Sequence, residues 1–159
     1  GYFASLGDME WRGIVEGLNR FEAEMAYDYI PGVLDFIADL KRHGVKRAVV
    51  TSSNDAKMEN VYRMHPEFKG LFDAIVTANQ ITRSKPDPEC FLLGAKACGA
   101  IPANSFVFED SFHGLEAGRA AGMRVVGLAT TNPREAIEGL TDRVIPDFTG
   151  FRFGDLMAV

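Results

Sequence analysis

The sequence predicts a three-layer α/β fold, in which a parallel β-sheet carries helices on both faces. Short apolar segments alternate with amphipathic segments along most of the chain. The apolar segments are continuous rather than alternating, which is typical of strands buried on both faces of a parallel sheet. Strand–helix alternation of this kind indicates βαβ units with right-handed crossovers.

The expected elements follow in order. Residues 8–27 carry apolar side chains at helical spacing and are expected to form a helix. "YIPG" (29–32) predicts a turn, and Gly44 is suited to end a second helix that begins at residue 33. Beyond that point we expect strands at 47–53, 72–78, 106–109 and 124–129, a weaker edge strand at 143–148, and helices at 55–64, 87–99 and from residue 111 to Ala121.

Composition restricts the class of protein. The 159 residues carry a net charge of −5 and no dense block of Lys or Arg, which argues against nucleic acid or an anionic membrane as the main partner. No apolar segment is long enough to cross a bilayer, and the first residues do not resemble a signal peptide. Cys90 and Cys98 lie eight residues apart on one expected helix, about 12 Å along its axis, too far for a disulfide. We expect buried free thiols in a cytoplasmic, monomeric protein.

Polar residues follow the first of these four strands, where the crevice of an open parallel sheet lies. Thr51, Ser52, Ser53 and Asn54 combine side-chain oxygens with the backbone amides of a helix start. Such a group can bind an anion, since the helix dipole and the unpaired N–H groups both face the ligand. Capping of the following helix by Ser53 or Asn54 is the alternative interpretation.

Three charged residues complete the expected site. Glu109 and Asp110 stand side by side after the buried strand "FVF", and adjacent carboxylates of this kind suit Mg²⁺. Lys85 precedes "PDP", whose prolines favour a stiff backbone, although a solvated lysine is the alternative. An anion site, a fixed cation and a carboxylate pair in one crevice are what phosphoryl transfer requires. His113 is a weaker candidate for contact with a substrate.

Three segments carry a family resemblance. "AVVTSSN", "SKPDPECF" and "FVFEDSFHGLEAGRAAG" resemble, in order and spacing, three motifs of the haloacid dehalogenase-like phosphohydrolases, most closely the subfamily of β-phosphoglucomutase and sugar-phosphate phosphatases. The resemblance runs from about Tyr29 to Leu128. It implies a Rossmann-like core in which Thr51 and Ser52 hold the phosphoryl group, Lys85 pairs with it and with the nucleophile, and Glu109 and Asp110 bind Mg²⁺.

One motif of the family is missing. Its nucleophile is the first aspartate of an Asp-x-Asp motif that ends the first strand, and no such motif follows an apolar run in this chain. The resemblance implies that residues 1–28 are the last part of a helical cap domain, and that residues 29–159 are a core lacking its first, central strand. That strand would lie between those ending at Thr51 and Glu109, leaving a gap of ~9–10 Å with unpaired backbone groups. We therefore expect either an incomplete record of a longer protein or another segment in the gap.

The function expected from these observations is Mg²⁺-dependent hydrolysis of a small phosphorylated metabolite such as a sugar phosphate, through an aspartyl-phosphate whose aspartate lies outside this sequence. The fragment as written is then expected to be inactive. A sugar phosphomutase is one alternative. A non-catalytic phosphate- or metal-binding regulatory protein is another, and it leads if the chain is complete. A receiver domain fits less well, because Thr51 and Thr77 stand where its acceptor aspartate would end an interior strand.

Overall fold

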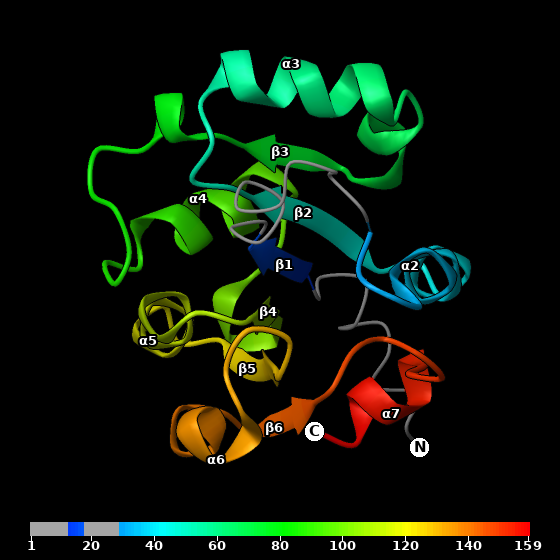
Figure 1. Ribbon diagram of the computed structural model, residues 1–159, viewed down its shortest axis with the longest axis vertical. Coiled ribbons are helices and arrows are strands. Elements are labelled where there is room, and N and C mark those ends of the chain that lie inside the picture. The colour runs from blue at the N-terminus through cyan, green and yellow to red at the C-terminus, as the bar shows by residue number, and fades with distance from the viewer. Residues whose placement is uncertain (1–12, 18–28) are drawn as a thin grey trace.

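The computed structural model describes residues 13–17 and 29–159 and contains a six-stranded sheet in which every pairing is parallel (Figure 1). The strand order is β3-β2-β1-β4-β5-β6. The strands are β1 (Gly13–Gly17), β2 (Lys46–Val50), β3 (Ala74–Val76), β4 (Phe106–Glu109), β5 (Arg124–Leu128) and β6 (Arg143–Ile145). The sheet thus has the architecture expected from the alternation of strands and helices. The strand expected at 106–109 is confirmed with the same bounds, and those expected at 47–53, 72–78, 124–129 and 143–148 are confirmed as shorter strands.

The strand β1 corrects two expectations. Residues 13–17 pair with β2 on one side and with β4 on the other, so they form the central strand and not part of a helix over 8–27. The core of this chain therefore does not lack a central strand, because a segment assigned to the cap occupies the gap. The physical reason is that β2 and β4 would otherwise leave two rows of backbone groups unpaired. The rest of the expected cap, residues 1–12 and 18–28, lies outside the described residues.

Helices cover both faces of the sheet, and strands and helices alternate along most of the chain (Figure 1). On one face lie α2 (Val33–Arg42), α3 (Asp55–Met64) and α7 (Phe153–Met157). On the other lie α4 (Glu89–Ala97), α5 (Phe112–Ala120) and α6 (Arg134–Ile137). Short 3₁₀ helices span Phe68–Leu71, Ala78–Gln80, Pro102–Asn104 and Glu138–Leu140. The helices α6 and α7 were not expected from the sequence.

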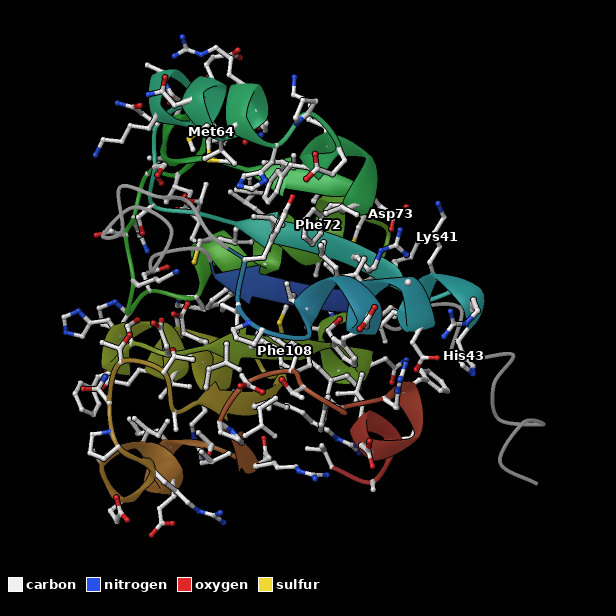
Figure 2. The ribbon with its side chains drawn as sticks, turned by 45° about the vertical axis from the view of Figure 1, so that its right-hand side comes forward. Lys41, His43, Met64, Phe72, Asp73 and Phe108 are labelled. Carbon is white, nitrogen blue, oxygen red and sulfur yellow. The ribbon has the colours of Figure 1, made fainter. Side chains whose placement is uncertain are left out.

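An aromatic cluster fills the core between α2, α7 and the sheet. The ring of Phe36 stacks on that of Phe148 with centroids 5.3 Å apart and meets the edge of Phe108 at 5.4 Å. Figure 2 shows Phe108 inside the molecule, whereas Lys41 on α2 is exposed. Full burial of each such ring contributes about 1.5–3 kcal/mol relative to exposure. This cluster fixes the position of β4, the strand that ends at Glu109.

Asp39 ties the end of the chain to α2. Its Oδ2 accepts a hydrogen bond of 2.7 Å from the backbone N–H of Phe153, and its Oδ1 accepts one of 2.9 Å from Arg42. Burial acts to raise the pKa of Asp39, but these donors and the nearby His43 outweigh it and hold the pKa below its ordinary value. The carboxylate is therefore a stabilising contact only while it is ionised.

The turn before α2 requires glycine. Gly32 has a φ of 81°, and a Cβ atom there would lie 2.4 Å from the carbonyl carbon of Phe148. The chain can make this close approach only without a side chain.

Among the described residues, no helix is long and apolar enough to span a membrane. Cys90 and Cys98 are both buried and free, as expected.

Candidate active site

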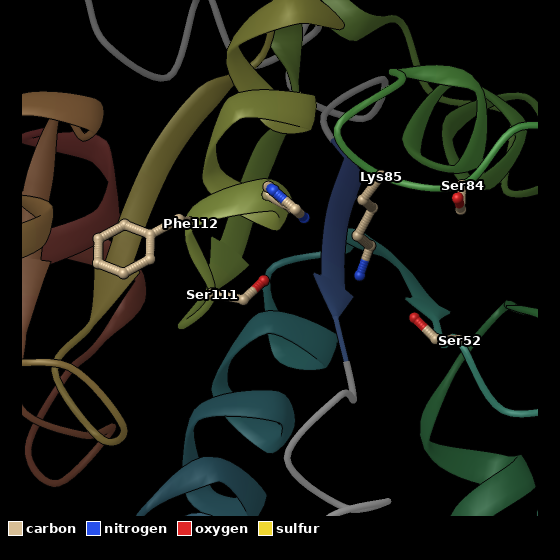
Figure 3. A pocket seen from close by; sticks show the side chains of 6 residues that line it. Ser52, Ser84, Lys85, Ser111 and Phe112 are labelled. Atoms are coloured by element: carbon tan, nitrogen blue, oxygen red, sulfur yellow. The ribbon is translucent and has the colours of Figure 1, made fainter.

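The candidate site lies at the carboxyl ends of the central strands, where β2 and β4 give way to the loops that begin α3 and α5. Ser52, Ser84, Lys85, Ser111, Phe112 and His113 line a cavity of about 390 Å³. A second cavity of about 210 Å³ shares Ser52, Ser84 and Lys85 and adds Thr51 and Cys90. Figure 3 shows the side chain of Lys85 extending between Ser111 and Ser52, while the ring of Phe112 points away from it. Of the residues expected to form a site, Thr51, Ser52 and Lys85 thus line the same crevice.

Lys85 and Glu109 form a buried ion pair. The Nζ atom of Lys85 lies 3.0 Å from Oε2 of Glu109, and the two side chains are 8% and 0% exposed. Lys85 also lies 5.1 Å from the ring centroid of Phe91 on α4, a cation–π contact. The favoured alternative for this lysine, a solvated side chain, is therefore wrong.

The second oxygen of Glu109 is held by the turn that follows β4. Its Oε1 accepts hydrogen bonds from the backbone N–H of Asp110 at 3.1 Å, and from the N–H and hydroxyl of Ser111 at 3.3 Å each. The Ser111 hydroxyl in turn accepts the N–H of Gly114 at 3.0 Å and so caps α5. Both oxygens of Glu109 are therefore engaged by donors from this chain.

Glu109 also depends on a glycine in α5. A Cβ atom at Gly114 would lie 2.2 Å from Cγ and Cδ of Glu109, so that only glycine fits against the carboxyl group. Burial raises the pKa of Glu109, while Lys85 acts in the opposite direction and the neighbouring Asp110 carboxylate raises it further. The ion pair with Lys85 is what favours the charged form in this enclosed position.

Asp110 has a different environment. It is 6% exposed, and its Oδ2 accepts a hydrogen bond of 2.7 Å from the hydroxyl of Thr131. Its backbone carbonyl accepts a hydrogen bond of 3.2 Å from the side chain of Asn132. Among the described residues no donor reaches Oδ1, so this oxygen keeps its lone pairs for another ligand.

The two acids fit one part of a magnesium site. Residues 13–17 and 29–159 contain no group of three or more His, Cys, Asp or Glu side chains that could hold a metal. Mg²⁺ does not need such a group, because it is commonly bound by one or two carboxylates together with waters and a phosphate oxygen. Asp110 offers a hard oxygen of the right kind, whereas Glu109 would have to share an oxygen that Lys85 already contacts.

The four residues after β2 divide into two groups. Thr51 and Ser52 line the cavities beside Lys85. Ser53 is buried, and its N–H donates to Oγ1 of Thr51 at 3.0 Å. Asn54 accepts the N–H of Lys57 at 2.8 Å and caps α3, which is the alternative role anticipated for it. The geometry thus brings Thr51 and Ser52 to the crevice, and the phosphate-binding role of all four residues stays a prediction.

The sequence interpretation missed residues around this crevice. Ser84 and Ser111 line the larger cavity, and Thr131 and Asn132 contact Asp110 from the loop after β5. The rule that directed attention to the residues after β2 and β4 applies equally to the loop after β5, where it would have found Thr131 and Asn132. His113, a weaker candidate, lines the larger cavity.

The central strand carries no aspartate at its carboxyl end. Gly17 is the last residue of β1 and pairs with Val50 of β2, one residue before Thr51. Leu18 follows in the sequence. Within the described residues, the carboxyl end of the central strand therefore has Gly17 and not the aspartate that ends the first strand in the family motif.

The fold and the crevice define a parallel α/β protein whose candidate site gathers hydroxyl groups, a buried lysine and two carboxylates at the ends of its strands. Residues 5–128 match the family described as haloacid dehalogenase-like hydrolase, so the chain belongs to that family. The resemblance carried by the three sequence motifs is confirmed.

Relatives and solved structures agree with this assignment. The chain is 33% identical over 123 residues to the bifunctional riboflavin kinase/FMN phosphatase of Arabidopsis thaliana, which is 77% of this chain and 32% of that protein. It is 34% identical over 113 residues to the protein CbbY of Cereibacter sphaeroides, which is 67% of this chain and 49% of CbbY. The chain thus spans about half the length, or less, of these relatives.

Among solved structures, CbbY from Rhodobacter sphaeroides in complex with phosphate superimposes with a TM-score of 0.73 at 29% identity, covering 87% of this chain and 64% of that one. β-Phosphoglucomutase from Clostridium difficile gives a TM-score of 0.73 at 26% identity, covering 87% of this chain and 59% of that one. The expected Rossmann-like α/β fold is therefore confirmed.

Proposed function

We propose that this chain is the core of a Mg²⁺-dependent enzyme that transfers the phosphoryl group of a small phosphorylated metabolite, most simply by hydrolysing a sugar phosphate. The observation that carries the proposal is the Lys85–Glu109 ion pair, which lies beside Asp110 in a crevice that Thr51 and Ser52 also line. Membership of the haloacid dehalogenase-like hydrolase family supports the same reaction class.

Each residue of the crevice has a role in this proposal. Lys85 orients the phosphoryl group and neutralises charge on it, because its amino group extends into the space beside Ser52 (Figure 3). Thr51 and Ser52 donate hydrogen bonds to phosphoryl oxygens. Asp110, with Glu109 behind it, holds the Mg²⁺, which when bound neutralises charge that develops on the transferring group.

The nucleophile in this proposal is an aspartate outside the sequence, which forms and then releases an aspartyl-phosphate. The carboxyl end of β1, where such a residue would be needed, has the sequence Glu16-Gly17 and contains no aspartate. A segment that carries the aspartate would have to bring it to the space between Thr51 and Glu109. The sequence as it stands is therefore expected to bind the phosphoryl group without catalysing its transfer.

The names of relatives support the substrate class. They include the fructose-1-phosphate phosphatase YqaB and the hexitol phosphatase A of Escherichia coli, at 36% and 34% identity over 84 and 101 residues. A sugar phosphomutase is the second candidate, and the similarity to β-phosphoglucomutase favours it. Water accepts the phosphoryl group in the first reaction and a sugar hydroxyl in the second.

Partners and compartment follow the same reasoning. The net charge of −5 supports a small anionic substrate bound locally at Lys85 rather than nucleic acid or an anionic membrane surface. The two buried free thiols support a reducing compartment, for which the cytoplasm is our proposal. A monomer is proposed as the working unit.

The first test is the intact mass of the protein expressed from its complete gene, followed by assays with a panel of sugar phosphates with and without Mg²⁺. A mass well above 17.5 kDa, with phosphate release that requires Mg²⁺ and is lost in Asp110→Asn, is the expected result. Release of phosphate separates hydrolysis from mutase activity, which would interconvert two sugar phosphates instead.

A mass of 17.5 kDa would remove the aspartate on which the reaction depends. The third candidate, a regulatory protein that binds phosphate or a metal without catalysis, would then replace the enzyme. Equally, a larger protein that hydrolyses substrates at the same rate after Lys85→Met would contradict the proposed role of the crevice.

A further inference from the structure

We propose that Thr131, in the loop between β5 and α6, is a positioning residue that orients the Asp110 carboxylate for Mg²⁺ binding. This inference rests on the proposed function, since it assigns a role toward the same cation. The Thr131 hydroxyl donates to Oδ2 of Asp110 at 2.7 Å. The contact crosses 21 residues of sequence and joins the ends of two neighbouring strands, β4 and β5.

The loop is fixed at both ends and touches Asp110 twice. At its start the N–H of Ala129 donates to the carbonyl of Ile145 on β6 at 2.9 Å. At its end Pro133 precedes α6, whose Ile137 is fully buried. Between these anchors Asn132 donates to the backbone carbonyl of Asp110, so the loop holds the main chain and the carboxylate of one residue together.

The neighbouring threonine makes no contact of this kind. Thr130 Oγ1 is buried and has no hydrogen-bond partner among the described residues. An unsatisfied buried hydroxyl costs about 1–3 kcal/mol, and such a group in a folded protein calls for an explanation. The loop leaves Thr130 unsatisfied in the same conformation that directs the adjacent Thr131 hydroxyl to Asp110.

The consequence is an asymmetry between the two oxygens of Asp110. Thr131 occupies Oδ2 and restricts rotation of the carboxylate, while Oδ1 has no donor within the described part of the chain. Both oxygens of Glu109 accept hydrogen bonds from Lys85 or from the turn after β4, so Oδ1 of the neighbouring Asp110 is the oxygen of the pair that we assign to the cation. Outer-sphere partners of a metal ligand typically change metal affinity 10–100-fold when they are removed.

The experiment measures Mg²⁺ binding by isothermal titration calorimetry on the protein from its complete gene, with no substrate present. Thr131→Val removes the hydroxyl at nearly constant volume and is expected to weaken binding about 10-fold or more, whereas Thr131→Ser keeps a hydroxyl and restores most of the affinity. Thr130→Val is the matched control, because it makes the same change one residue away without touching Asp110. Thr131 is exposed, so the melting temperature of Thr131→Val stays close to that of the wild type.

Three results would overturn the inference, and they can be told apart. If Thr131→Val binds Mg²⁺ as tightly as the wild type while Asp110→Asn does not, Thr131 has no positioning role and the proposed metal site stands. If the wild type binds no Mg²⁺, the positioning role and the Mg²⁺-dependent function both fail. Equal weakening by Thr130→Val and Thr131→Val would likewise contradict the inference, because it would indicate a general effect of the loop.

Discussion

Replacing Lys85 with methionine removes the cation that faces Glu109. The two side chains are 8% and 0% exposed, and Nζ lies 3.0 Å from Oε2, so the variant leaves the Glu109 carboxylate buried without its cation. Methionine keeps about the length and the apolar stem of lysine, but it loses the cation–π contact with Phe91 together with the ion pair. The variant therefore tests the charge rather than the volume.

The expected magnitude follows from the burial of Glu109. Removing one partner of a buried ion pair destabilises a protein by about 3–5 kcal/mol, because the other charge stays buried and uncompensated. Three donors to Oε1 remain and limit the cost, as does protonation of Glu109. We expect Lys85→Met to lower the free energy of unfolding by about 3 kcal/mol at neutral pH.

The assay is urea unfolding followed by circular dichroism, with Glu109→Gln and the double variant completing a thermodynamic cycle. The double variant is expected to be less destabilised than the sum of the single variants by about 2–3 kcal/mol, since it leaves neither charge unpaired. Lys57→Met is the control, because Lys57 is exposed on α3 and its replacement should change stability by less than about 0.5 kcal/mol.

The reasoning would be refuted if Lys85→Met unfolded within about 0.5 kcal/mol of the wild type, as a surface lysine does. A cycle without coupling would refute it as well, even if both single variants were unstable. In that case each side chain would stabilise the fold through its packing, and the ion pair would contribute nothing of its own.

Further predictions concern stability and reactivity. Asp39→Asn is expected to lower the free energy of unfolding by about 1–3 kcal/mol at pH 7. Because the folded-state pKa of Asp39 is held below its ordinary value of 3.8, this stabilisation is present at neutral pH and is lost as the pH falls through the folded-state pKa. Urea titrations of variant and wild type should therefore differ at pH 7, and the difference should shrink at pH 3. Gly114→Ala is expected to displace Glu109 and destabilise the fold by about 1–3 kcal/mol in the same assay, whereas Gly139→Ala, where no atom lies within 4 Å of the added Cβ, should leave stability unchanged. Burial raises the pKa of the Cys90 thiol, so Ellman's reagent should modify it at least about tenfold more slowly in the native protein than in urea, and equal rates would contradict its burial.

The sheet was predictable because its strands are continuous apolar runs that end in polar residues. The carboxyl ends of such strands meet at one edge, which is why Lys85, Glu109 and the residues after β2 could be expected in one crevice before any geometry was known. The direct pairing of Lys85 with Glu109 was not predicted, because the two acids were assigned to Mg²⁺ and Lys85 to the phosphoryl group.

The central strand and the contact between Thr131 and Asp110 were not predictable in the same way. The segment "GIVEG" lies within a stretch of helical periodicity, and only the unpaired backbone of its neighbours β2 and β4 favours a strand there. Thr131 contacts Asp110 across 21 residues through a loop without periodicity. Local pattern carries no information about such long-range contacts, which depend on how the strands are ordered in the sheet.

The two edge strands of the sheet affect whether molecules of this protein aggregate at high concentration. The edge strands β3 and β6 are three residues long each, shorter than the four or five residues of the interior strands. A strand from a neighbouring molecule could therefore pair with only a few exposed backbone groups, and Pro146 directly after β6 offers no N–H to extend the pairing. An open parallel sheet with such short edge strands resists edge-to-edge aggregation, while its interior strands stay paired with one another.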